Sequence, residues 1–436
     1  MTAADGLQRA RRAWSLYDWA NSAFALSVMS ALFPPFFRGL ALDAGFAPGT
    51  ATALWGYVTA GGLLLVAVTA PVLGAVADVT GGRKRYLAFF AGLGVLFTAL
   101  FVLIGPGAWR TAALLYVGAN FGFAASIVFY ESLLPGLARG PELDRLSARA
   151  YSLGYAGSGL LLLLNLAWVM RPGWFGLPDA GVALKVSFVS VAVWWGVFSV
   201  PLLRHVPEPP VVREAGDTGT GPVARQGFRR LWRTFGEIRR QRSLLVFLLA
   251  YWIYNDGIGT IVKMATAYGS ELGIGRTHLI GALVLTQVVG IPCALACGRL
   301  AQAWGAKRTV LLTLAGYLAI SVGGYFMASP LHFYLLAGAV GMVQGGAQAL
   351  SRSLFAVMVP AHRSAEYFGF FATSGKLAGV TGPLVFGIVS QVTGTGRLGI
   401  LSLLAFFVVG GVLLARVDVA AGVAEARRIE REAGAA

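Results

Sequence analysis

The sequence predicts an all-α membrane protein of twelve transmembrane helices, arranged as two bundles of six. Two features of the composition support this: 57% of the 436 residues are hydrophobic and only 12% are charged, about half the charged fraction of a soluble domain. The third observation is the length of the apolar runs, which reach the roughly 20 residues that a helix needs to cross a bilayer. Because these runs are continuous and do not alternate every second residue, they favour helices over a β-barrel.

Twelve such runs can be placed along the chain, and one long polar stretch separates the sixth from the seventh. The predicted spans are 15–37, 52–77, 86–105, 111–136, 150–170, 181–203, 244–269, 278–302, 308–328, 331–358, 365–392 and 398–416. We therefore expect a first six-helix bundle at 1–203, a linker at 204–242, a second six-helix bundle at 243–417 and a tail at 418–436.

Loop charges predict the orientation of these helices, since positively charged loops stay on the cytoplasmic side. We expect the protein in the plasma (inner) membrane, with both termini in the cytoplasm. In this orientation the basic clusters all lie on the cytoplasmic side: Arg9, Arg11, Arg12, Arg83, Lys84, Arg85, Arg139, Arg145, Arg149, Lys307, Arg308, Arg363, Arg427, Arg428 and Arg431. The outer loops hold single arginines: Arg38, Arg110, Arg171, Arg276 and Arg397. Topology thus accounts for the net charge of +16, and nucleic acid is not an expected partner. No cleavable signal peptide is expected either.

The end of the linker has the pattern of an amphipathic helix. Apolar residues recur there at helical spacing and arginines occupy the positions between them: Phe228, Leu231, Trp232, Phe235 and Ile238 against Arg229, Arg230, Arg233, Arg239 and Arg240. Such a helix is expected to lie on the cytoplasmic face of the membrane. A calmodulin-type target helix is the alternative for the same pattern.

The two halves of the chain carry a repeated motif. After the second predicted helix, Gly74 is followed by Asp78, Gly82 and the basic run Arg83, Lys84 and Arg85. After the eighth, six helices later, the corresponding positions are Gly298, Gln302, Gly305, Lys307 and Arg308. Two repeated halves with a binding site between them are typical of secondary transporters.

The first copy of the motif resembles the signature loop of the major facilitator superfamily. It departs from that pattern by one extra residue before Gly82 and by the lack of a basic residue directly after Asp78. The resemblance implies a cytoplasmic latch in which Asp78 faces the start of the eleventh helix, whose N-terminal dipole favours an anion. It also implies that Arg83 or Arg85 pairs with acidic residues.

A narrower resemblance covers nearly the whole chain. Five segments are similar to the vacuole-effluxer (autophagy-related) branch of that superfamily: Ser15–Phe24, Ser152–Gly157, Tyr254–Thr260, Gly345–Ser353, and Glu366–Phe370 followed by Gly382 and Pro383. The resemblance implies export of small solutes, with amino acids the class associated with fungal members. It does not carry a substrate over to a bacterial-type chain.

Polar side chains inside predicted spans give candidate functional residues, because ionisable groups in a membrane are costly and mark function by default. They concentrate on helices 1, 4, 7 and 10, which line the central cavity in the fold that the resemblance implies. By depth along each helix we expect a substrate-binding layer of Asn21, Asn120, Asp256, Gln344 and Gln348. Nearer the cytoplasm we expect coupling or gating by Asp18, Glu131 and Arg352, with Lys263 two turns outward of Asp256.

Each of these residues has a structural alternative. Asp18 could act locally as a cap or as a partner of Arg12. Asp256 could make a buried hydrogen bond, and Lys263 could extend its amine to the membrane surface. Glu131 and Arg352 could form a static pair in place of a gate.

Other chemistry is not expected. The four histidines are widely separated, which predicts no metal site. Gly375-Lys376 follows Gly369 at one residue too long for a phosphate loop, and Leu377 replaces the required hydroxyl residue. We therefore expect no cofactor, no ATP drive and no enzymatic activity.

The sequence as a whole predicts a secondary transporter for a small polar organic solute, working as a monomer in the lipid bilayer. Proton coupling through Asp256 or Glu131 is left open. A lipid flippase or a transporter-like receptor on the same fold is the main alternative. A membrane enzyme would need clustered histidines or carboxylates, and a channel would need a repeated filter or charged ring.

Overall fold

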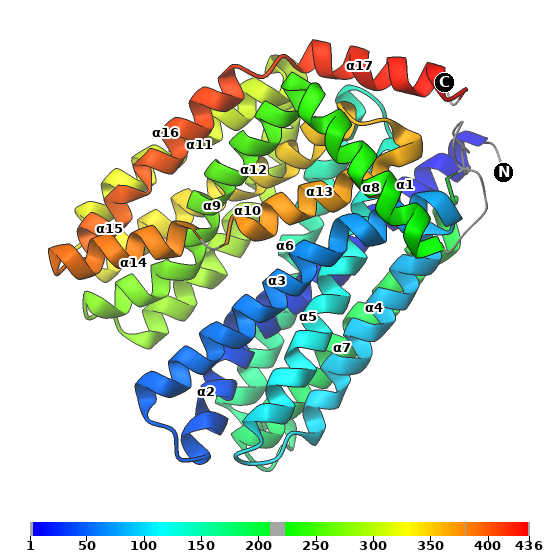
Figure 1. The fold of residues 1–436 in the computed structure, drawn as a ribbon. Coiled ribbons are helices and arrows are strands. Elements are labelled where there is room, and N and C mark those ends of the chain that lie inside the picture. The colour runs from blue at the N-terminus through cyan, green and yellow to red at the C-terminus, as the bar shows by residue number, and fades with distance from the viewer. Residues whose placement is uncertain (1–2, 210–222, 380, 435–436) are drawn as a thin grey trace. The chain divides into compact units, whose positions relative to one another are not determined.

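The computed structural model describes residues 3–209, 223–379 and 381–434, and within these ranges all regular structure is helical. In the first half of the chain the helices are α1 Ala3–Ala23, α2 Phe33–Asp43, α3 Pro48–Thr80, α4 Arg83–Ala99, α5 Trp109–Ser132, α6 Pro141–Met170 and α7 Ala180–His205. In the second half they are α8 Val223–Arg240, α9 Arg242–Glu271, α10 Arg276–Trp304, α11 Ala306–Tyr325, α12 Pro330–Val357, α13 Ser364–Leu377, α14 Thr381–Thr393, α15 Gly396–Ser402, α16 Leu404–Ala415 and α17 Val419–Glu432 (Figure 1).

Helices occupy all twelve predicted spans. Within the described ranges, eleven helical segments are long and apolar enough to cross a membrane. The remaining prediction, at 308–328, corresponds to the 20-residue α11, which packs against α10, α12 and α16. The prediction of an all-α membrane protein is confirmed.

The chain forms two compact units. Unit 1 contains Met1–Val66, Arg83–Tyr130 and Leu153–Glu208. Unit 2 contains Ala67–Gly82, Glu131–Ser152 and Pro209–Ala436, so α3, α5 and α6 contribute residues to both. These units are groups of packed residues and differ from the halves of the sequence repeat, and the division into bundles at 1–203 and 243–417 stays a prediction.

In unit 1 the helices α1 and α4 both pack against α7. Aromatic rings fill the space between helices: Phe33 lies 4.6 Å from Phe101 and 4.9 Å from Tyr116, measured between ring centroids. The indole N–H of Trp14 donates to the carbonyl oxygen of Tyr130 at 2.9 Å. Between α1 and α2 the helix continues as a π-helix over Phe24–Leu32, a form that is rare and often found near functional sites.

In unit 2 the helix α9 contacts α12, α13, α14 and α16, and α10, α11 and α12 pack on one another. Two of the predicted continuous spans are broken: 365–392 is split into α13 and α14, and 398–416 into α15 and α16. The predicted tail is largely the helix α17, whose first turn is capped by Asp418 through the N–H of Ala421 at 2.9 Å.

The loops of the repeated motif turn at glycine. Gly82 and Gly305 both have positive φ, at 79° and 87°, a conformation that side chains other than glycine rarely adopt. This explains why both copies of the motif place glycine just before the next helix. In the predicted linker, residues 210–222 lie outside the described residues, and α8 follows them.

Candidate functional site

Two of the predicted substrate-layer residues belong to unit 1 and are deeply buried. Asn120 on α5 is 1% exposed and Asn21 on α1 is 3% exposed. Neither amide atom of Asn120, nor the amide nitrogen of Asn21, has a hydrogen-bond partner among the described residues. The side chain of Asn120 faces α3, since a Cβ on Gly62 would lie 3.3 Å from its amide nitrogen. Buried amides without partners are costly, and a bound solute would satisfy them.

The other three substrate-layer residues belong to unit 2. Gln344 and Gln348 lie one turn apart on α12 and are half-buried, and the structure gives neither of them a hydrogen bond within the ranges that it describes. Asp256 on α9 is 1% exposed, and its Oδ2 accepts the N–H of Gly382 at 2.9 Å. Its Oδ1 has no partner among the described residues. Asp256 therefore caps the start of α14 with one oxygen and keeps the other available.

Lys263 lies two turns from Asp256 on the same helix. Its ammonium group donates to the carbonyl oxygen of Gly379 at 3.2 Å, and its side chain is exposed. The lysine thus contacts Gly379, just beyond the end of α13. Its extension to the membrane surface stays a prediction.

Arg352 is 2% exposed and is held by the first turns of α6, within unit 2. Its Nε donates to Oγ of Ser147 at 2.9 Å and its Nη2 donates to the carbonyl oxygen of Ser147 at 3.1 Å. The guanidinium lies 4.6 Å from the centroid of the Tyr151 ring, a cation–π distance. Arg352 therefore joins α12 to α6.

The predicted carboxylates of the gate are both buried, Glu131 at 7% and Asp18 at 9% exposure. Glu131 belongs to unit 2 and Asp18 to unit 1. Tyr251 on α9 lies within electrostatic range of both Glu131 and Arg352. Glu131, Tyr251 and Arg352 are thus parts of one polar cluster in unit 2.

The first copy of the repeated motif makes the contact that the family resemblance implies for Asp78. Oδ2 of Asp78 accepts the N–H of Glu366, in the first turn of α13, at 2.8 Å. Gly74, one turn earlier, lets α3 approach closely: a Cβ there would overlap the carbonyl oxygen of Ala365 and lie 2.7 Å from its carbonyl carbon. In the first turn of α4, which follows, Arg83 is buried and Arg85 is exposed.

The second copy of the motif makes a matching contact with α6. Arg145 donates to Oε1 of Gln302 at 2.9 Å, and the amide nitrogen of Gln302 lies 3.5 Å from the carbonyl oxygen of Pro141. A Cβ on Gly298 would lie 2.5 Å from Cβ of Ala148. The second and eighth helices therefore hold the starts of the eleventh and fifth helices in the same way, one with an acid and one with an amide.

A repeated Ser-Ala pair in these contacts escaped the sequence analysis. Ser147 on α6 donates to the carbonyl oxygen of Ala349 on α12 at 2.7 Å. Ser364 on α13 donates to the carbonyl oxygen of Ser132 at the end of α5, also at 2.7 Å. The residue after each serine, Ala148 or Ala365, is the one that the motif glycine contacts. The signal was present as two Ser-Ala dipeptides at the starts of equivalent helices.

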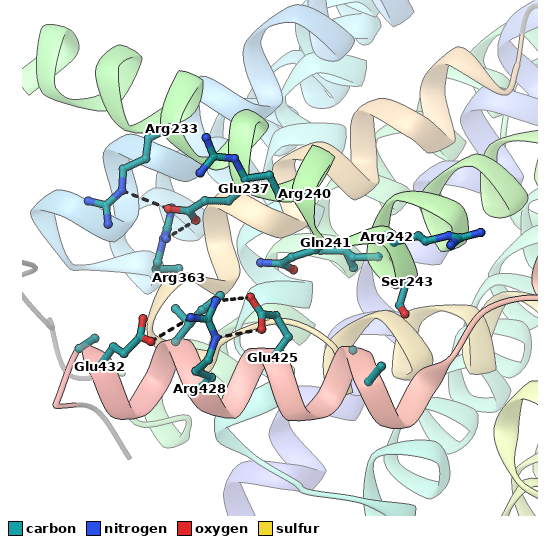
Figure 2. Close-up of a pocket in the computed structure, with 15 residues that line it drawn as sticks. Arg233, Glu237, Arg240, Gln241, Arg242, Ser243, Arg363, Glu425, Arg428 and Glu432 are labelled. Carbon is teal, nitrogen blue, oxygen red and sulfur yellow. Dashed lines mark hydrogen bonds and ion pairs between the residues drawn. The ribbon is translucent and has the colours of Figure 1, made fainter.

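A charged pocket lies elsewhere, at the end of α8 and the start of α9 beside α17 (Figure 2). It has a volume of about 580 Å³ and its charged lining consists of Arg233, Glu237, Arg240, Arg242, Arg363, Glu425, Arg428 and Glu432. Glu425 and Glu432 both pair with Arg428, at 2.6 and 3.1 Å. The hydrogen bond from Arg428 lowers the pKa of the Glu425 carboxyl below its ordinary value. None of the predicted substrate-layer residues is among those that line this pocket.

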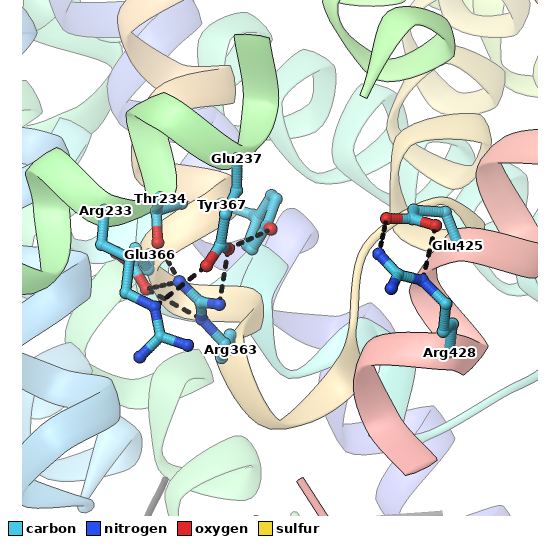
Figure 3. Close-up of polar contacts among 8 residues, drawn as sticks. All are labelled: Arg233, Thr234, Glu237, Arg363, Glu366, Tyr367, Glu425 and Arg428. Carbon is cyan, nitrogen blue, oxygen red and sulfur yellow. Dashed lines mark hydrogen bonds and ion pairs between the residues drawn. The ribbon is translucent and has the colours of Figure 1, made fainter. Parts of the chain in front are cut away.

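Arg363 ties α8 to the start of α13 (Figure 3). The arginine is 1% exposed, and it pairs with Glu237 on α8 at 2.7 Å and with Glu366 on α13 at 3.3 Å. It also donates to Thr234, and the hydroxyl of Tyr367 donates to Glu237 at 3.5 Å. The first turn of α13 is therefore held by Asp78 through its backbone and by α8 through Arg363.

On α8, two large apolar side chains remain exposed, Trp232 at 61% and Phe235 at 42%. They lie beside the arginines of the predicted amphipathic pattern, Arg233, Arg239 and Arg240. The side chains of 223–231, which include Phe228 and Leu231 from that pattern, lie outside the described residues. The described part of α8 has the distribution of a helix at a membrane surface.

Comparison with known proteins places these features in one family. Residues 7–427 match the model of the family described as vacuole effluxer Atg22 like. An uncharacterized MFS-type transporter, YxiO of Bacillus subtilis, is 37% identical over 405 residues, which cover 93% of this chain and 94% of that protein. Autophagy-related protein 22 of Eremothecium gossypii is 25% identical over 473 residues, covering 95% of this chain and 92% of its own.

Solved structures show the same fold. The human organic anion transporter MFSD10 matches with a TM-score of 0.72 at 16% identity, over 95% of this chain and 100% of its own. The proton:xylose symporter XylE matches with a TM-score of 0.71 at 12% identity, over 95% and 96%. The fold is therefore the major facilitator fold, as the signature loop predicted.

Proposed function

This chain belongs to the vacuole effluxer Atg22-like family of major facilitator transporters, and from that premise we propose that it moves a small polar organic solute by alternating access. Like its relatives, it is a multi-pass membrane transporter and not an enzyme. The proposal concerns the solute, the direction of transport, the coupling ion and the residues that serve them.

The observation that carries the proposal is the set of free amide side chains inside membrane spans. Asn120 on α5 and Gln344 and Gln348 on α12 have no hydrogen-bond partner in the described part of the chain, and Asn21 on α1 has none for its amide nitrogen. The hydrocarbon region of a membrane offers no hydrogen-bond partner to an amide group. A polar solute that accepts and donates hydrogen bonds would satisfy them, which favours solute transport over a lipid flippase.

The relatives suggest the class of solute and the direction. The matching family is described as vacuole effluxers, and amino acids are the solutes that the sequence resemblance implied for fungal members. We propose efflux of amino acids or similar small solutes, with Asn21 and Asn120 as the solute contacts of unit 1 and Gln344 and Gln348 as those of unit 2.

Asp256 is the proposed coupling carboxylate. It is 1% exposed, holds Gly382 with one oxygen and leaves the other without a partner among the described residues. Protonation of Oδ1 would leave the capping bond in place, so this residue can exchange a proton while the start of α14 stays held. Glu131 is the alternative site.

The function is tested in proteoliposomes that report internal pH during exposure to amino acids, peptides and sugars. The wild type should move protons with one class of solute, and Asp256→Asn, which keeps an acceptor for Gly382, should abolish proton movement while the protein remains folded. Solute flux without proton flux in the wild type would remove Asp256 from coupling. No flux of any solute in folded protein would contradict the transporter proposal itself.

The gate is proposed to centre on Arg352. Arg352→Ala removes two hydrogen bonds to Ser147 and the contact with the Tyr151 ring, and it removes a positive charge from a cluster that contains Glu131. We expect at least about a tenfold loss of solute flux, since loss of a buried charged partner costs several kcal/mol. Arg352→Lys keeps the charge without the planar geometry and should be intermediate. Wild-type flux in Arg352→Ala would contradict the gate.

The remaining proposals concern placement in the membrane. We propose that both termini face the cytoplasm and that α8 lies in the cytoplasmic interface of the plasma membrane, with Trp232 and Phe235 in the headgroup region. The signature motif, with Asp78, Gly82 and the first-turn residues Arg83 and Arg85 of α4, would then lie on the same side. We also propose a monomer as the working unit.

A further inference from the structure

The eleventh membrane span is broken, and opposite charges on α9 hold the two ends at the break. Figure 1 shows α13 and α14 as separate helices, with α13 ending at Leu377 and α14 beginning at Thr381. Lys263 donates to the carbonyl oxygen of Gly379 at 3.2 Å, just beyond the end of α13. Asp256 accepts the N–H of Gly382 at 2.9 Å, in the first turn of α14. Each charge has the sign that its helix end favours.

The break is closely fitted to α9. A Cβ on Gly382 would overlap the hydroxyl of Thr260 and lie 2.8 Å from Oδ1 of Asp256. Gly375, one turn before the break, also faces α9. A Cβ added at this position would lie 3.4 Å from the hydroxyl of Tyr251 and 3.9 Å from the amide nitrogen of Asn255. The two glycines allow both half-helices to contact α9.

A second lysine sits at the same helix end. Lys376 lies in the last turn of α13 and is half-buried. Its ammonium group has no hydrogen-bond partner in the part of the chain that the structure describes. It is close enough to Lys263 to be repelled by it, and within range of Glu131 to be attracted. In the sequence, Lys376 belongs to the Gly375-Lys376 pair, whose spacing from Gly369 does not fit a phosphate loop.

The end of α13 carries two positive charges. Lys376 lies in its last turn, and Lys263 reaches it from α9 through the carbonyl oxygen of Gly379. Net charge inside a membrane span is costly, and it is reduced by a counter-ion of opposite sign. The structure therefore has two lysines at one helix end, and an anion bound there would offset their charge.

We propose that Lys376 and Lys263 bind the anionic group of the transported solute at the break in the eleventh span. The occupant is a solute of net negative charge, such as a carboxylate, which would be favoured over a neutral or zwitterionic solute of the same size. When Lys263 turns from Gly379 to the ligand, the end of α13 loses its bond, so binding loosens the break. This inference rests on the proposed transport function and names the charge of its solute.

The test uses charged thiol reagents, which need no knowledge of the solute. Asn255, beside Gly375 on the facing helix, is replaced by cysteine in full-length protein that also carries Cys293→Ser and Cys297→Ser. Rates with a sulfonate-bearing and a trimethylammonium-bearing methanethiosulfonate are each divided by the rate with free cysteine. We expect the anionic reagent to be favoured about tenfold, a factor equal to ~1.4 kcal/mol. The preference should disappear with Lys376→Gln or Lys263→Gln and remain with Lys376→Arg.

Equal rates for the two reagents, a faster cationic reagent or no reaction with either would overturn the proposal, as would a preference that survives Lys376→Gln. A transport assay with L-glutamate and L-glutamine, two solutes of nearly equal size, supplies the second measurement. Transport of both at rates unchanged by Lys376→Gln would overturn the anion site and leave the transporter intact. Absence of flux in folded protein would count against the proposed function alone, because the reagent rates do not depend on transport.

Discussion

The two copies of the repeated motif solve one packing problem with different chemistry. In the first copy, Asp78 on α3 is 4% exposed and gives a carboxylate oxygen to the N–H of Glu366. In the second, Gln302 on α10 is partly exposed and uses its amide with Arg145 and Pro141. Both copies place a glycine one turn earlier against the alanine of a Ser-Ala pair.

The difference follows from the helix that each motif holds. The first turn of α6 already contains two acidic residues, Glu142 and Asp144, which favour its N-terminal dipole without help from α10. The first turn of α13 contains Glu366, but that carboxylate pairs with Arg363 at 3.3 Å. Asp78 supplies a further negative charge at the first turn of α13. The comparison teaches that the repeat preserves the contact and adjusts its charge to the partner helix.

The largest predicted effect comes from adding a methyl group at the motif glycines. Gly74→Ala and Gly298→Ala should each cost ~1–3 kcal/mol of stability, as overpacking does, and lower the thermal unfolding midpoint of the purified protein. The methyl on residue 298 meets only Cβ of Ala148 within 3 Å, whereas the methyl on residue 74 meets the backbone of Ala365. Ala148→Gly should therefore restore Gly298→Ala.

The matched control is Ala365→Gly, which leaves the carbonyl group of residue 365 in place. It should not restore Gly74→Ala. Rescue of both pairs, or of neither, would show that the two contacts are not built as the structure indicates.

An intermediate effect is expected at the carboxylate of the first copy. Asp78→Ala removes the acceptor for Glu366 N–H and should cost ~1–2 kcal/mol, as loss of an N-terminal cap does. Asp78→Asn keeps an acceptor and should cost about half as much, since only the charge is lost. Hydrogen exchange of the amides at 364–368 should rise in the same order. Gln302→Ala should leave those amides unchanged and raise exchange only at 141–145.

Equal exchange in Asp78→Asn and Asp78→Ala would mean that charge alone holds the helix start. A rise at 141–145 caused by Asp78→Ala would mean that the two copies are coupled and do not act separately.

Much of this arrangement could be predicted from the sequence, because it depends on composition and spacing. Hydropathy placed all twelve spans, and the resemblance to the signature loop of the major facilitator superfamily implied the contact of Asp78 with the start of the eleventh helix, which the structure gives at 2.8 Å. The family follows from the same segments. The spans and the motif itself are local, since each is set by a few residues near one another in the chain.

The break in the eleventh span was not predicted, since the apolar run from 365 to 392 is continuous and hydropathy does not register an interruption. Gly379, Gly382 and Pro383 were its only local signal, and the charges that hold it come from α9, more than a hundred residues earlier. Lys376 was missed for the same reason: its significance depends on Lys263 across the helix pair. The helix α17 also escaped, although Asp418 is a normal N-terminal cap.

The smallest effect should come from giving the second copy the charge of the first. Gln302→Glu would place a carboxylate beside Arg145, but the site is exposed and Glu142 and Asp144 already lie in the same helix turn. We expect stabilisation below ~0.5 kcal/mol, which is usual for exposed pairs, and its loss in high salt because such charges are screened. The unfolding midpoint at low and high salt, with Arg145→Ala as control, measures this. A large gain that persists in salt would show that the carboxylate caps α6 as Asp78 caps α13, and the explanation by partner-helix charge would then be wrong.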